Sequence, residues 1–297
     1  MLKRKGNTPK STHKGVTIMK KILSLVLALC MILGSIALFA SCAKTDEPTN
    51  TVVNEPEQND TESKPAVKTL KLGFDAEYPP YGYLDTDTNT YKGFDLDFAK
   101  EVCKEIGYEV ELIPIDWDAK DLELNSGNID CIWSGFTIQG REDQYEWTVP
   151  YSDSSIVVLT KADSGINAIA DLAGKVVTVQ KESSGQGALD EDADLVATFK
   201  GGQYELCADY TAAFNDLTAG AVDAVVIDIG VANSLIEGKA GYVILTEALA
   251  VEQYGVGFKL GNKELCKLVS DAMVKLADKA AEIAVVYGLE DSIKIAK

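Results

Sequence analysis

Histidine and arginine are nearly absent from this chain of 297 residues. The one histidine is His13, and the two arginines are Arg4 and Arg141. From residue 14 onward the chain therefore has no imidazole, which excludes a catalytic triad built on histidine and a zinc site with histidine ligands. Because lysine supplies almost all other positive charge, the single arginine in the body of the chain, Arg141, stands out.

Positive charge is also scarce as a whole, with 28 Lys and Arg against 46 Asp and Glu and a formal net charge of -18. Residues 1–41 hold seven of the positive side chains and no acidic one, so the rest of the chain is seven charges more negative than the whole. Such a surface repels phosphate backbones, and we therefore expect no nucleic-acid partner.

The cysteines show neither a CxxC pair nor the spacing of metal ligands. We expect the last four of the six to be small buried thiols, and we expect no metal and no other cofactor. A disulfide between Cys103 and Cys131 is the alternative, and their spacing does not support it. The six are Cys30, Cys42, Cys103, Cys131, Cys207 and Cys266.

The first 41 residues have the layout of a bacterial secretory signal peptide. The segment "MKKILSLVLALCMILGSIALFASCAK" begins at Met19 with two lysines, continues as an apolar run and ends in small residues before Cys42. It is also similar to a lipoprotein signal, in which Ala40-Ser41-Cys42 is the lipobox, although Phe39 stands where leucine is usual. We expect a signal peptide over 1–41, with 19 as a second candidate start, and lipidation of Cys42. An uncleaved transmembrane anchor is the alternative.

Residues 43–66, "AKTDEPTNTVVNEPEQNDTESKPA", are polar and rich in proline and acidic side chains. A segment with so little apolar surface to bury is typical of disordered chain. We therefore expect 42–66 to be a lipidated tether, which would hold an extracytoplasmic protein at the cell membrane.

Strand and helix patterns alternate from residue 67 onward. Strands are expected at 67–74, 109–115 and 129–136, helices at 94–108 and 118–127, and a hairpin within 81–94. This alternation predicts an α/β fold whose sheets are mixed, mostly parallel and flanked by helices.

Two stretches of the chain repeat one pattern. Both "LNSGNIDCIWSGF" (124–136) and "LTAGAVDAVVIDI" (217–229) have a helix end, a glycine cap, a turn aspartate and an apolar strand. The repeat predicts two lobes built on the same unit. Chance similarity between two helix-to-strand turns is the alternative.

Ligands of open α/β sheets bind beyond the carboxyl ends of the strands. In two facing lobes this rule places residues 133–137 at the mouth of the first and Asp228 at that of the second. Arg141 lies in the loop directly after residues 133–137. Its planar guanidinium can hold a carboxylate through two hydrogen bonds, which a lysine cannot. A surface ion pair with Glu142 or Asp143 is the alternative.

A second anion-binding feature is predicted where the strand 176–180 leads through Ser183, Ser184 and Gly185 into a helix. Free backbone N–H groups and the positive end of the helix dipole meet at such a junction. The segment has neither a dinucleotide-binding fingerprint nor a P-loop. An ordinary helix cap is the alternative.

A series of fragments is similar to one protein family. In order along the chain they resemble the solute-binding proteins of polar amino-acid ABC importers, over nearly all of residues 67–297. The fragments are "GFDAEYPPYGY", "GFDLDFAKEV", "PIDWD", "SGNIDCIWSGFTI", "VPYSDS", "DLAGKVVTVQ", "TAGAVDAVVID" and "YGVGFKLGNKEL".

The resemblance implies a two-lobed clamshell of the periplasmic-binding-protein type, joined by two hinge strands. Lobe 1 would comprise 67–160 and 250–297, and lobe 2 would comprise 161–249. The hinge strands would lie near Val157–Lys161 and Glu252–Gly257.

The resemblance also assigns roles to single residues. Arg141, with Thr137 and Ser184, would bind the ligand α-carboxylate, and Asp228 would bind the α-ammonium group. Two departures from the family stand out: Gln-Gly precedes Arg141, one residue shorter than usual, and Glu182 adds a negative charge nearby. The remaining side chains that would border the ligand are Asp75, Tyr78, Trp117, Ser134, Gly135, Phe136 and Gln180.

We therefore expect a monomeric extracytoplasmic lipoprotein, not an enzyme, that captures a polar amino acid and delivers it to the permease and ATPase of an ABC importer. A dehydratase on the same scaffold is one alternative, with Glu77 or Glu182 as its catalytic acid. A ligand-sensing module is another. The acidic surface slightly favours a cationic ligand.

Overall fold

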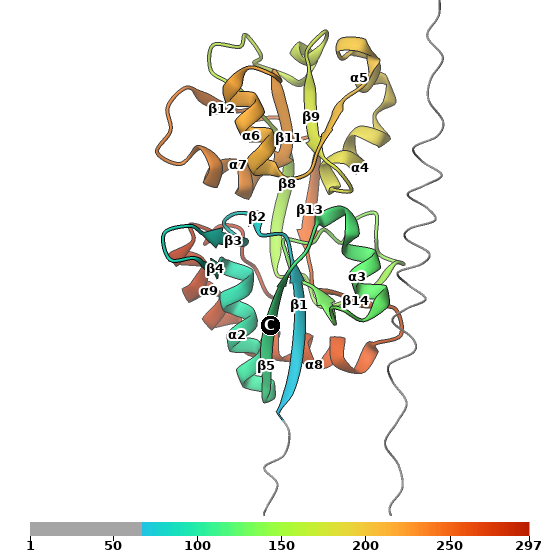
Figure 1. Cartoon of the computed structure of the whole chain (residues 1–297), viewed down its shortest axis with the longest axis vertical. Coiled ribbons are helices and arrows are strands. Elements are labelled where there is room, and N and C mark those ends of the chain that lie inside the picture. Colours follow the sequence, from blue (N-terminus) through green and yellow to red (C-terminus); the bar gives the residue numbers. More distant parts are fainter. Residues whose placement is uncertain (1–66, 297) are drawn as a thin grey trace, which may run out of the picture. The chain divides into compact units, whose positions relative to one another are not determined.

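The computed structural model describes residues 67–296, which lie within a compact unit that spans Ser63–Lys297 (Figure 1). The predicted signal peptide, lipidated Cys42 and tether lie outside the described residues. Within 67–296, none of the helices combines the length and the apolar character needed to cross a membrane.

The first sheet has five strands in the order β5-β1-β6-β14-β7. The strand β1 lies parallel to β5 and β6, whereas β14 lies antiparallel to β6 and β7. The strands are β1 (Lys68–Phe74), β5 (Tyr108–Pro114), β6 (Cys131–Ile132), β7 (Tyr145–Trp147) and β14 (Gly257–Lys259).

Helices from both ends of the folded chain cover this sheet, and α2 packs against α8 and α9. The start of α2 requires a glycine, because a Cβ at Gly93 would lie 2.1 Å from the carbonyl oxygen of Tyr81. The helices are α2 (Phe94–Ile106), η1 (Trp117–Ala119), α3 (Lys120–Ser126), α8 (Lys263–Lys275) and α9 (Ala277–Val286). A separate small sheet contains β2 (Glu77–Tyr78), β3 (Gly82–Asp85) and β4 (Thr90–Lys92).

The second sheet has the order β10-β9-β11-β8-β12, and β13 pairs with β8. Its strands are β8 (Ser152–Lys161), β9 (Val177–Gln180), β10 (Glu205–Cys207), β11 (Ala224–Asp228), β12 (Tyr242–Ile244) and β13 (Ala250–Tyr254). Its helices are η2 (Ile169–Leu172), α4 (Ser184–Glu191), α5 (Ala193–Thr198), η3 (Lys200–Gly202), α6 (Tyr210–Ala219) and α7 (Ile229–Ile236).

The strands β8 and β13 connect the two sheets (Figure 1). They pair antiparallel from Ser152 with Tyr254 to Ile156 with Ala250. The other half of β8, Val157–Lys161, lies inside the second sheet against β11 and β12. The connecting part of β8 is therefore earlier in the chain than expected, because the residues after Ile156 are paired on both sides within the second sheet.

The repeated sequence pattern is a repeated structure. The helices α3 and α6 end at Gly127 and Gly220, each in the left-handed conformation with φ of 79°. The turn aspartate that follows accepts a backbone hydrogen bond at 2.8 Å in both places. Asp130 accepts from Lys71 of β1, and Asp223 accepts from Val176, directly before β9. The pair β1 and β6 thus corresponds to the pair β9 and β11.

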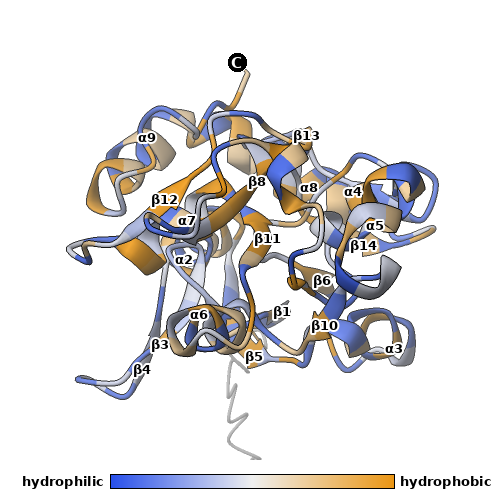
Figure 2. Cartoon of the chain, turned by 90° about the horizontal axis from the view of Figure 1, so that it is seen from above, coloured by the Kyte–Doolittle hydropathy of each residue, from blue (hydrophilic) through white to orange (hydrophobic). Residues whose placement is uncertain are grey.

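Apolar residues concentrate on strands such as β8, β11 and β12, whereas the helices carry both polar and apolar residues (Figure 2). All five residues of β11 are buried, as expected for a strand whose two faces are both covered. The thiols of Cys103, Cys131 and Cys266 are buried, Cys207 is half-buried, and all four are free. The alternative of a Cys103–Cys131 disulfide is therefore wrong.

The strand expected at 129–136 is much shorter in the structure, where only Cys131–Ile132 form β6. The chain leaves the sheet because the carboxylate of Asp95 binds the backbone N–H of Gly135 at 2.7 Å. Gly135 has φ of 54° there, which is left-handed backbone.

Candidate ligand-binding site

Nine of the eleven predicted ligand-binding residues line one small cavity between the two sheets, together with Ser183. The cavity has a volume of about 10 Å³, which is room for about one water molecule. A molecule the size of an amino acid would therefore enter only if the lobes moved apart. The nine are Tyr78, Trp117, Ser134, Gly135, Thr137, Arg141, Gln180, Ser184 and Asp228.

Asp75 and Phe136, the two other predicted residues, lie behind this cavity. Asp75 follows β1, is 5 % exposed, and accepts a hydrogen bond at 2.7 Å from the side-chain amide of Gln180 in the other lobe. Burial raises the pKa of Asp75 to about 6. Phe136 is fully buried and supports the ring of Trp117, whose centroid is 5.4 Å away, edge to face.

Arg141 reaches across the space between the lobes. Its guanidinium lies over the ring of Phe136 at 5.2 Å and donates hydrogen bonds at 3.2 Å to the carbonyl oxygens of Thr137 and Glu182. The planar group is thus fixed against an aromatic face, with one N–H group directed at its own lobe and one at the second lobe. It reaches this position although the loop before it is one residue shorter than the family pattern.

Three donors of the first lobe meet at one carbonyl oxygen of the second. The Glu182 carbonyl accepts hydrogen bonds from the indole N–H of Trp117 at 3.2 Å, from Lys120 Nζ at 3.4 Å and from Arg141. Two of these donors are cations, and Lys120 is only 2 % exposed. Burial lowers the pKa of the Lys120 ammonium group. Such a set of donors is suited to a carboxylate.

The start of α4 forms the opposite wall. Ser183 is the N-cap: its hydroxyl accepts a hydrogen bond from the N–H of Gln186 at 3.1 Å and donates to the carbonyl of Gln180 at 2.7 Å. Ser184 is the first helical residue. The helix N-terminus adds a second positive electrostatic contribution beside the donors of the first lobe.

Acidic groups lie at the other end of the cavity. Asp228 ends β11, is 1 % exposed, and accepts a hydrogen bond from the hydroxyl of Tyr254 at 2.6 Å. That hydroxyl also contacts Tyr78 Oη at 3.2 Å and Ser154 Oγ at 2.8 Å. The cavity therefore has hydrogen-bond donors at one end and a carboxylate at the other.

Glycine is required in the wall between these ends. A Cβ on Gly135 would lie 2.6 Å from the ring of Tyr78, and φ is positive at this position. The ring of Tyr78 is also 6.0 Å from that of Tyr210. The ligand backbone would therefore meet a flat surface of glycine and aromatic rings.

Sequence reasoning missed three residues at the site, Lys120, Tyr254 and Glu252, whereas Ser183 belongs to the predicted anion-binding junction and lines the cavity. Glu252 is 4 % exposed, and Thr137 Oγ1 donates a hydrogen bond to its Oε2 at 2.7 Å. Burial, and then the nearby Asp228 carboxylate, raise the pKa of Glu252 well above its usual value. An acidic residue in the largely apolar segment "ALAVEQYGVGF" is the signal that points to it.

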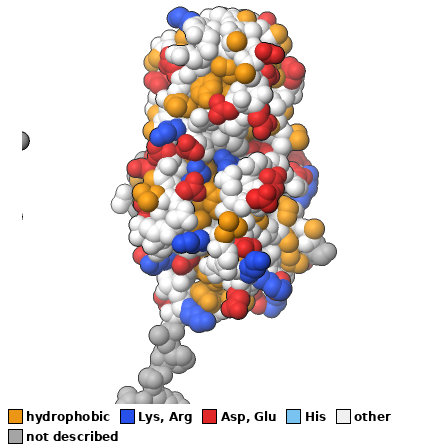
Figure 3. Space-filling model, turned by 90° about the vertical axis from the view of Figure 1, so that its right-hand side faces the viewer, with side chains coloured by type: hydrophobic (Ala, Val, Ile, Leu, Met, Phe, Trp, Pro, Cys, Tyr) orange, Lys and Arg blue, Asp and Glu red, His pale blue; other side chains and the backbone are white. Residues whose placement is uncertain are grey.

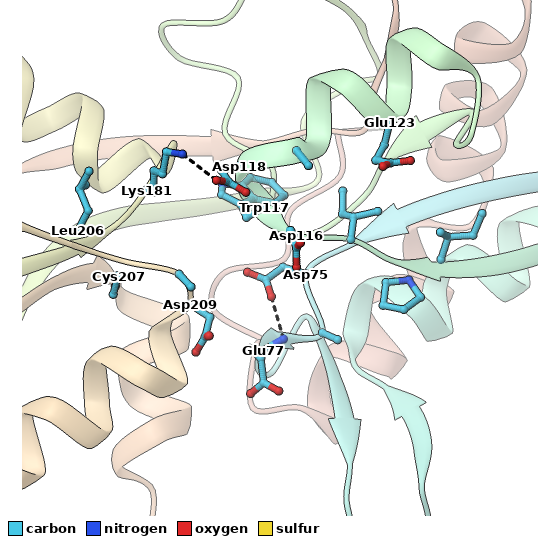
Figure 4. A pocket seen from close by; sticks show the side chains of 16 residues that line it. Asp75, Glu77, Asp116, Trp117, Asp118, Glu123, Lys181, Leu206, Cys207 and Asp209 are labelled. Carbon is cyan, nitrogen blue, oxygen red and sulfur yellow. Dashed lines mark hydrogen bonds and ion pairs between the residues drawn. The ribbon is translucent and has the colours of Figure 1, made fainter. Parts of the chain in front are cut away.

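A larger cavity of about 790 Å³ adjoins the first and shares Trp117 with it (Figure 4). Lys181 is its one basic side chain, and it pairs with Asp118 at 2.8 Å. Six acidic residues line this cavity, which we call the acidic pocket: Asp75, Glu77, Asp116, Asp118, Glu123 and Asp209. Because one lysine cannot balance six acidic side chains, the pocket suits a cationic group.

Residues 67–296 contain no group of three or more histidine, cysteine, aspartate or glutamate side chains arranged to hold a metal ion. Glu77 and Glu182, the acids that a dehydratase would need, both have exposed side chains. Neither is therefore enclosed in the apolar surroundings in which a carboxylic acid acts as a general acid.

Comparison with known proteins agrees with this arrangement. The model of the bacterial extracellular solute-binding proteins, family 3, matches residues 70–287. An L-cystine-binding protein of Escherichia coli is 31 % identical over 212 residues, which are 70 % of this chain and 77 % of the relative. An ABC transporter arginine-binding protein of the same organism is 28 % identical over 217 residues, 71 % of this chain and 86 % of the relative.

A solved structure also resembles this fold. The histidine-bound substrate-binding protein of a Streptococcus pneumoniae ABC uptake transporter has a TM-score of 0.73 and 29 % identity, and the match covers 76 % of this chain and 95 % of that one. The likeness extends over both sheets, so the arrangement is a two-lobed clamshell with helices flanking mixed sheets.

Proposed function

Because the chain belongs to family 3 of the bacterial extracellular solute-binding proteins, we propose that it captures a polar amino acid between its lobes and delivers it to an ABC importer. Its relatives are amino-acid-binding proteins of such importers, not enzymes. We propose that lobe 1 comprises residues 67–160 and 250–297 and that lobe 2 comprises residues 161–249.

The convergence of Trp117, Lys120 and Arg141 on the Glu182 carbonyl is the observation that carries the proposal. A free amino acid is a zwitterion, with a carboxylate and an ammonium group close together. The three donors match the carboxylate, and Asp228 at the opposite end matches the ammonium group. Each contact would be charge-assisted and shielded from water, which strengthens it.

We further propose that the ligand side chain carries a positive charge. The acidic pocket begins where the ligand cavity ends, at Trp117, and its one lysine is already paired. On the face shown in Figure 3, acidic side chains lie over both halves of the molecule with Lys and Arg interspersed. The field of these acids would attract a cationic ligand, less so at high salt.

Comparing two ligands in one variant tests this ligand class. Asp75→Asn keeps an oxygen that accepts from Gln180 but removes the negative charge at the border of the acidic pocket. We expect the affinity for L-arginine to fall about tenfold more than that for L-glutamine, which corresponds to about 1.4 kcal/mol. Isothermal titration calorimetry measures both. An unchanged ratio of the two affinities would contradict a cationic ligand.

We also propose that the mature chain is a monomeric lipoprotein, exported by the signal peptide over 1–41 and anchored to the cell membrane through Cys42. The apolar run before Cys42 and the polar composition of 43–66 support this. Cys42→Ala would then release the protein from the membrane fraction into the medium or periplasm, and retention of the variant would argue for an uncleaved anchor.

A further inference from the structure

The side chain of Glu252 is an unexplained feature of the ligand site. It lies on β13, one of the two connecting strands, and is 4 % exposed. Thr137 binds its Oε2 at 2.7 Å, whereas its Oε1 is buried without a hydrogen-bond partner. The neighbours of the carboxyl group, Thr137, Ser184 and Asp228, all line the ligand cavity.

No positive charge balances this group or Asp228. Within residues 67–296, neither carboxyl forms an ion pair with a lysine or arginine. Arg141 and Glu252 both line a further cavity of about 220 Å³, which shares Thr137, Ser183 and Ser184 with the ligand cavity. Arg141 nevertheless directs its N–H groups to the carbonyl oxygens of Thr137 and Glu182. The other titratable groups around Glu252 are four tyrosine hydroxyls and one carboxylate. The hydroxyls belong to Tyr78, Tyr81, Tyr210 and Tyr254. The carboxylate is that of Glu191 on α4, which lines the same cavity as Glu252 but is exposed.

Two buried carboxylates side by side repel each other, and an unpartnered buried oxygen costs further stability. A proton on Glu252 removes both problems, because the neutral acid can donate a hydrogen bond to the Asp228 carboxylate. The direction of the pKa shift of Glu252, upward through burial and Asp228, agrees with this.

We propose that Glu252 and Asp228 together bind the ligand ammonium group, and that this group displaces a proton that Glu252 holds in the ligand-free cleft. The inference rests on the proposed function. The ammonium group brings one positive charge and three N–H donors, so it replaces the proton as the partner of both carboxylates. The displaced proton passes to the solvent, and no other bond is made or broken.

The proposal has a consequence for specificity. An α-ammonium group fits between two carboxylates because it is charged and carries several donors. An N-acetylated amino acid has neither property, and it leaves the second carboxylate unpaired. Glu252 would therefore act as a specificity residue in addition to Asp228.

Calorimetry in two buffers of different ionisation enthalpy counts the displaced protons. Residues 63–297 are titrated near pH 7.5, above the pKa of about 6 of Asp75, so that Asp75 holds little of the displaced proton. The ligands are L-cystine, L-arginine, L-histidine and L-glutamine. We expect the wild type to release about one proton per bound amino acid. Glu252→Gln should release almost none and bind at least about tenfold more weakly, whereas Glu247→Gln, an exposed glutamate before β13, should match the wild type.

The possible outcomes separate the two proposals. Binding without proton release, or the same release in Glu252→Gln, overturns the role of Glu252 and leaves the proposed function intact. If none of the four amino acids binds, the proposed function fails as well. A carboxyl-carbon NMR titration of the ligand-free protein is a second measurement that needs no ligand. If Glu252 titrated at an ordinary glutamate pKa, the proposal that it holds a proton in the ligand-free cleft would be wrong.

Discussion

Arg141 shows how much one residue can indicate when its type is rare. In a chain that otherwise uses lysine, a guanidinium is required where two N–H donors must act together in one plane. The structure places Arg141 between the ring of Phe136 and the carbonyl of Glu182. Lysine cannot make the same pair of contacts, since its ammonium group is a single point of charge on a flexible stem.

Buried acids make the stability of the ligand-free protein depend on pH. Burial raises the pKa of Asp95 to about 7 and that of Asp75 to about 6, both above their usual value of 3.8. The folded state therefore binds these protons more tightly than the unfolded state does. The stability that these bound protons contribute is fully present below about pH 3.8, the usual pKa of aspartate. It is lost as the pH rises through about 6 for Asp75 and through about 7 for Asp95.

We therefore predict that the ligand-free protein becomes more stable as the pH falls from about 8 to about 5. Each group contributes up to about 1.4 kcal/mol per pH unit within its own window. Urea denaturation at several pH values measures the slope, and Asp95→Asn should reduce it between about pH 5 and pH 7. A stability that stays flat or falls on acidification over this window would be inconsistent with protonated buried acids.

At the scale of the elements, the two lobes share one construction, a helix that ends at a left-handed glycine before a buried strand. A Cβ on Gly127 would meet nothing within 4 Å, and one on Gly220 only Lys161 Nζ at 3.9 Å. We predict that Gly127→Ala and Gly220→Ala each lower the free energy of unfolding by about 1 kcal/mol, through backbone strain alone.

Chemical denaturation measures both variants against Gly187→Ala as the matched control. Gly187 lies within α4, has an ordinary helical φ and open space around it. Alanine there should raise the stability by roughly 0.5–1 kcal/mol, because it restricts the unfolded chain. If Gly127→Ala and Gly220→Ala left the free energy of unfolding unchanged, or changed it by very different amounts, the two glycines would not serve the same structural purpose.

The elements also show what the sequence can predict. The regular patterns of β1, β5 and α2 predict their bounds to within a residue or two, since each is set by local periodicity. The expected strand at 129–136 is mostly wrong because a distant side chain, Asp95, withdraws Gly135 from the sheet. No local pattern contains that information.

The strand β13 explains why Glu252 escaped prediction. Its apolar Val251 is 79 % exposed, whereas the polar side chains of Glu252 and Tyr254 point inward and are buried. The usual rule that apolar residues face the interior is reversed here, because this strand forms part of a polar cleft. Single-sequence reasoning that looks for an apolar face assigns the wrong side of such a strand.

For the whole molecule, the structure is a closed clamshell whose cleft is filled by its own groups. Hydrogen bonds from Trp117, Lys120 and Arg141 to Glu182, and from Gln180 to Asp75, join the lobes. A ligand favours a closed state only through contacts that it makes there. The proposed ligand carboxylate would take over the donors that now bind the Glu182 carbonyl. Those donors would then have a charged acceptor in place of a neutral one, and the hydrogen bonds would be stronger.

A thermal-shift screen of residues 63–297 against the twenty amino acids, cystine and ornithine tests the central claim most directly, when it is repeated with Arg141→Ala. A ligand at a hundred times its dissociation constant adds about 2.7 kcal/mol of stability. We predict a large upward shift of the melting temperature for one ligand or a few close analogues. The shift should be lost in Arg141→Ala. It should be kept in the control Lys267→Ala, which removes an exposed charge from α8. No shift with any compound, or an equal shift in Arg141→Ala, would contradict an amino-acid site at Arg141.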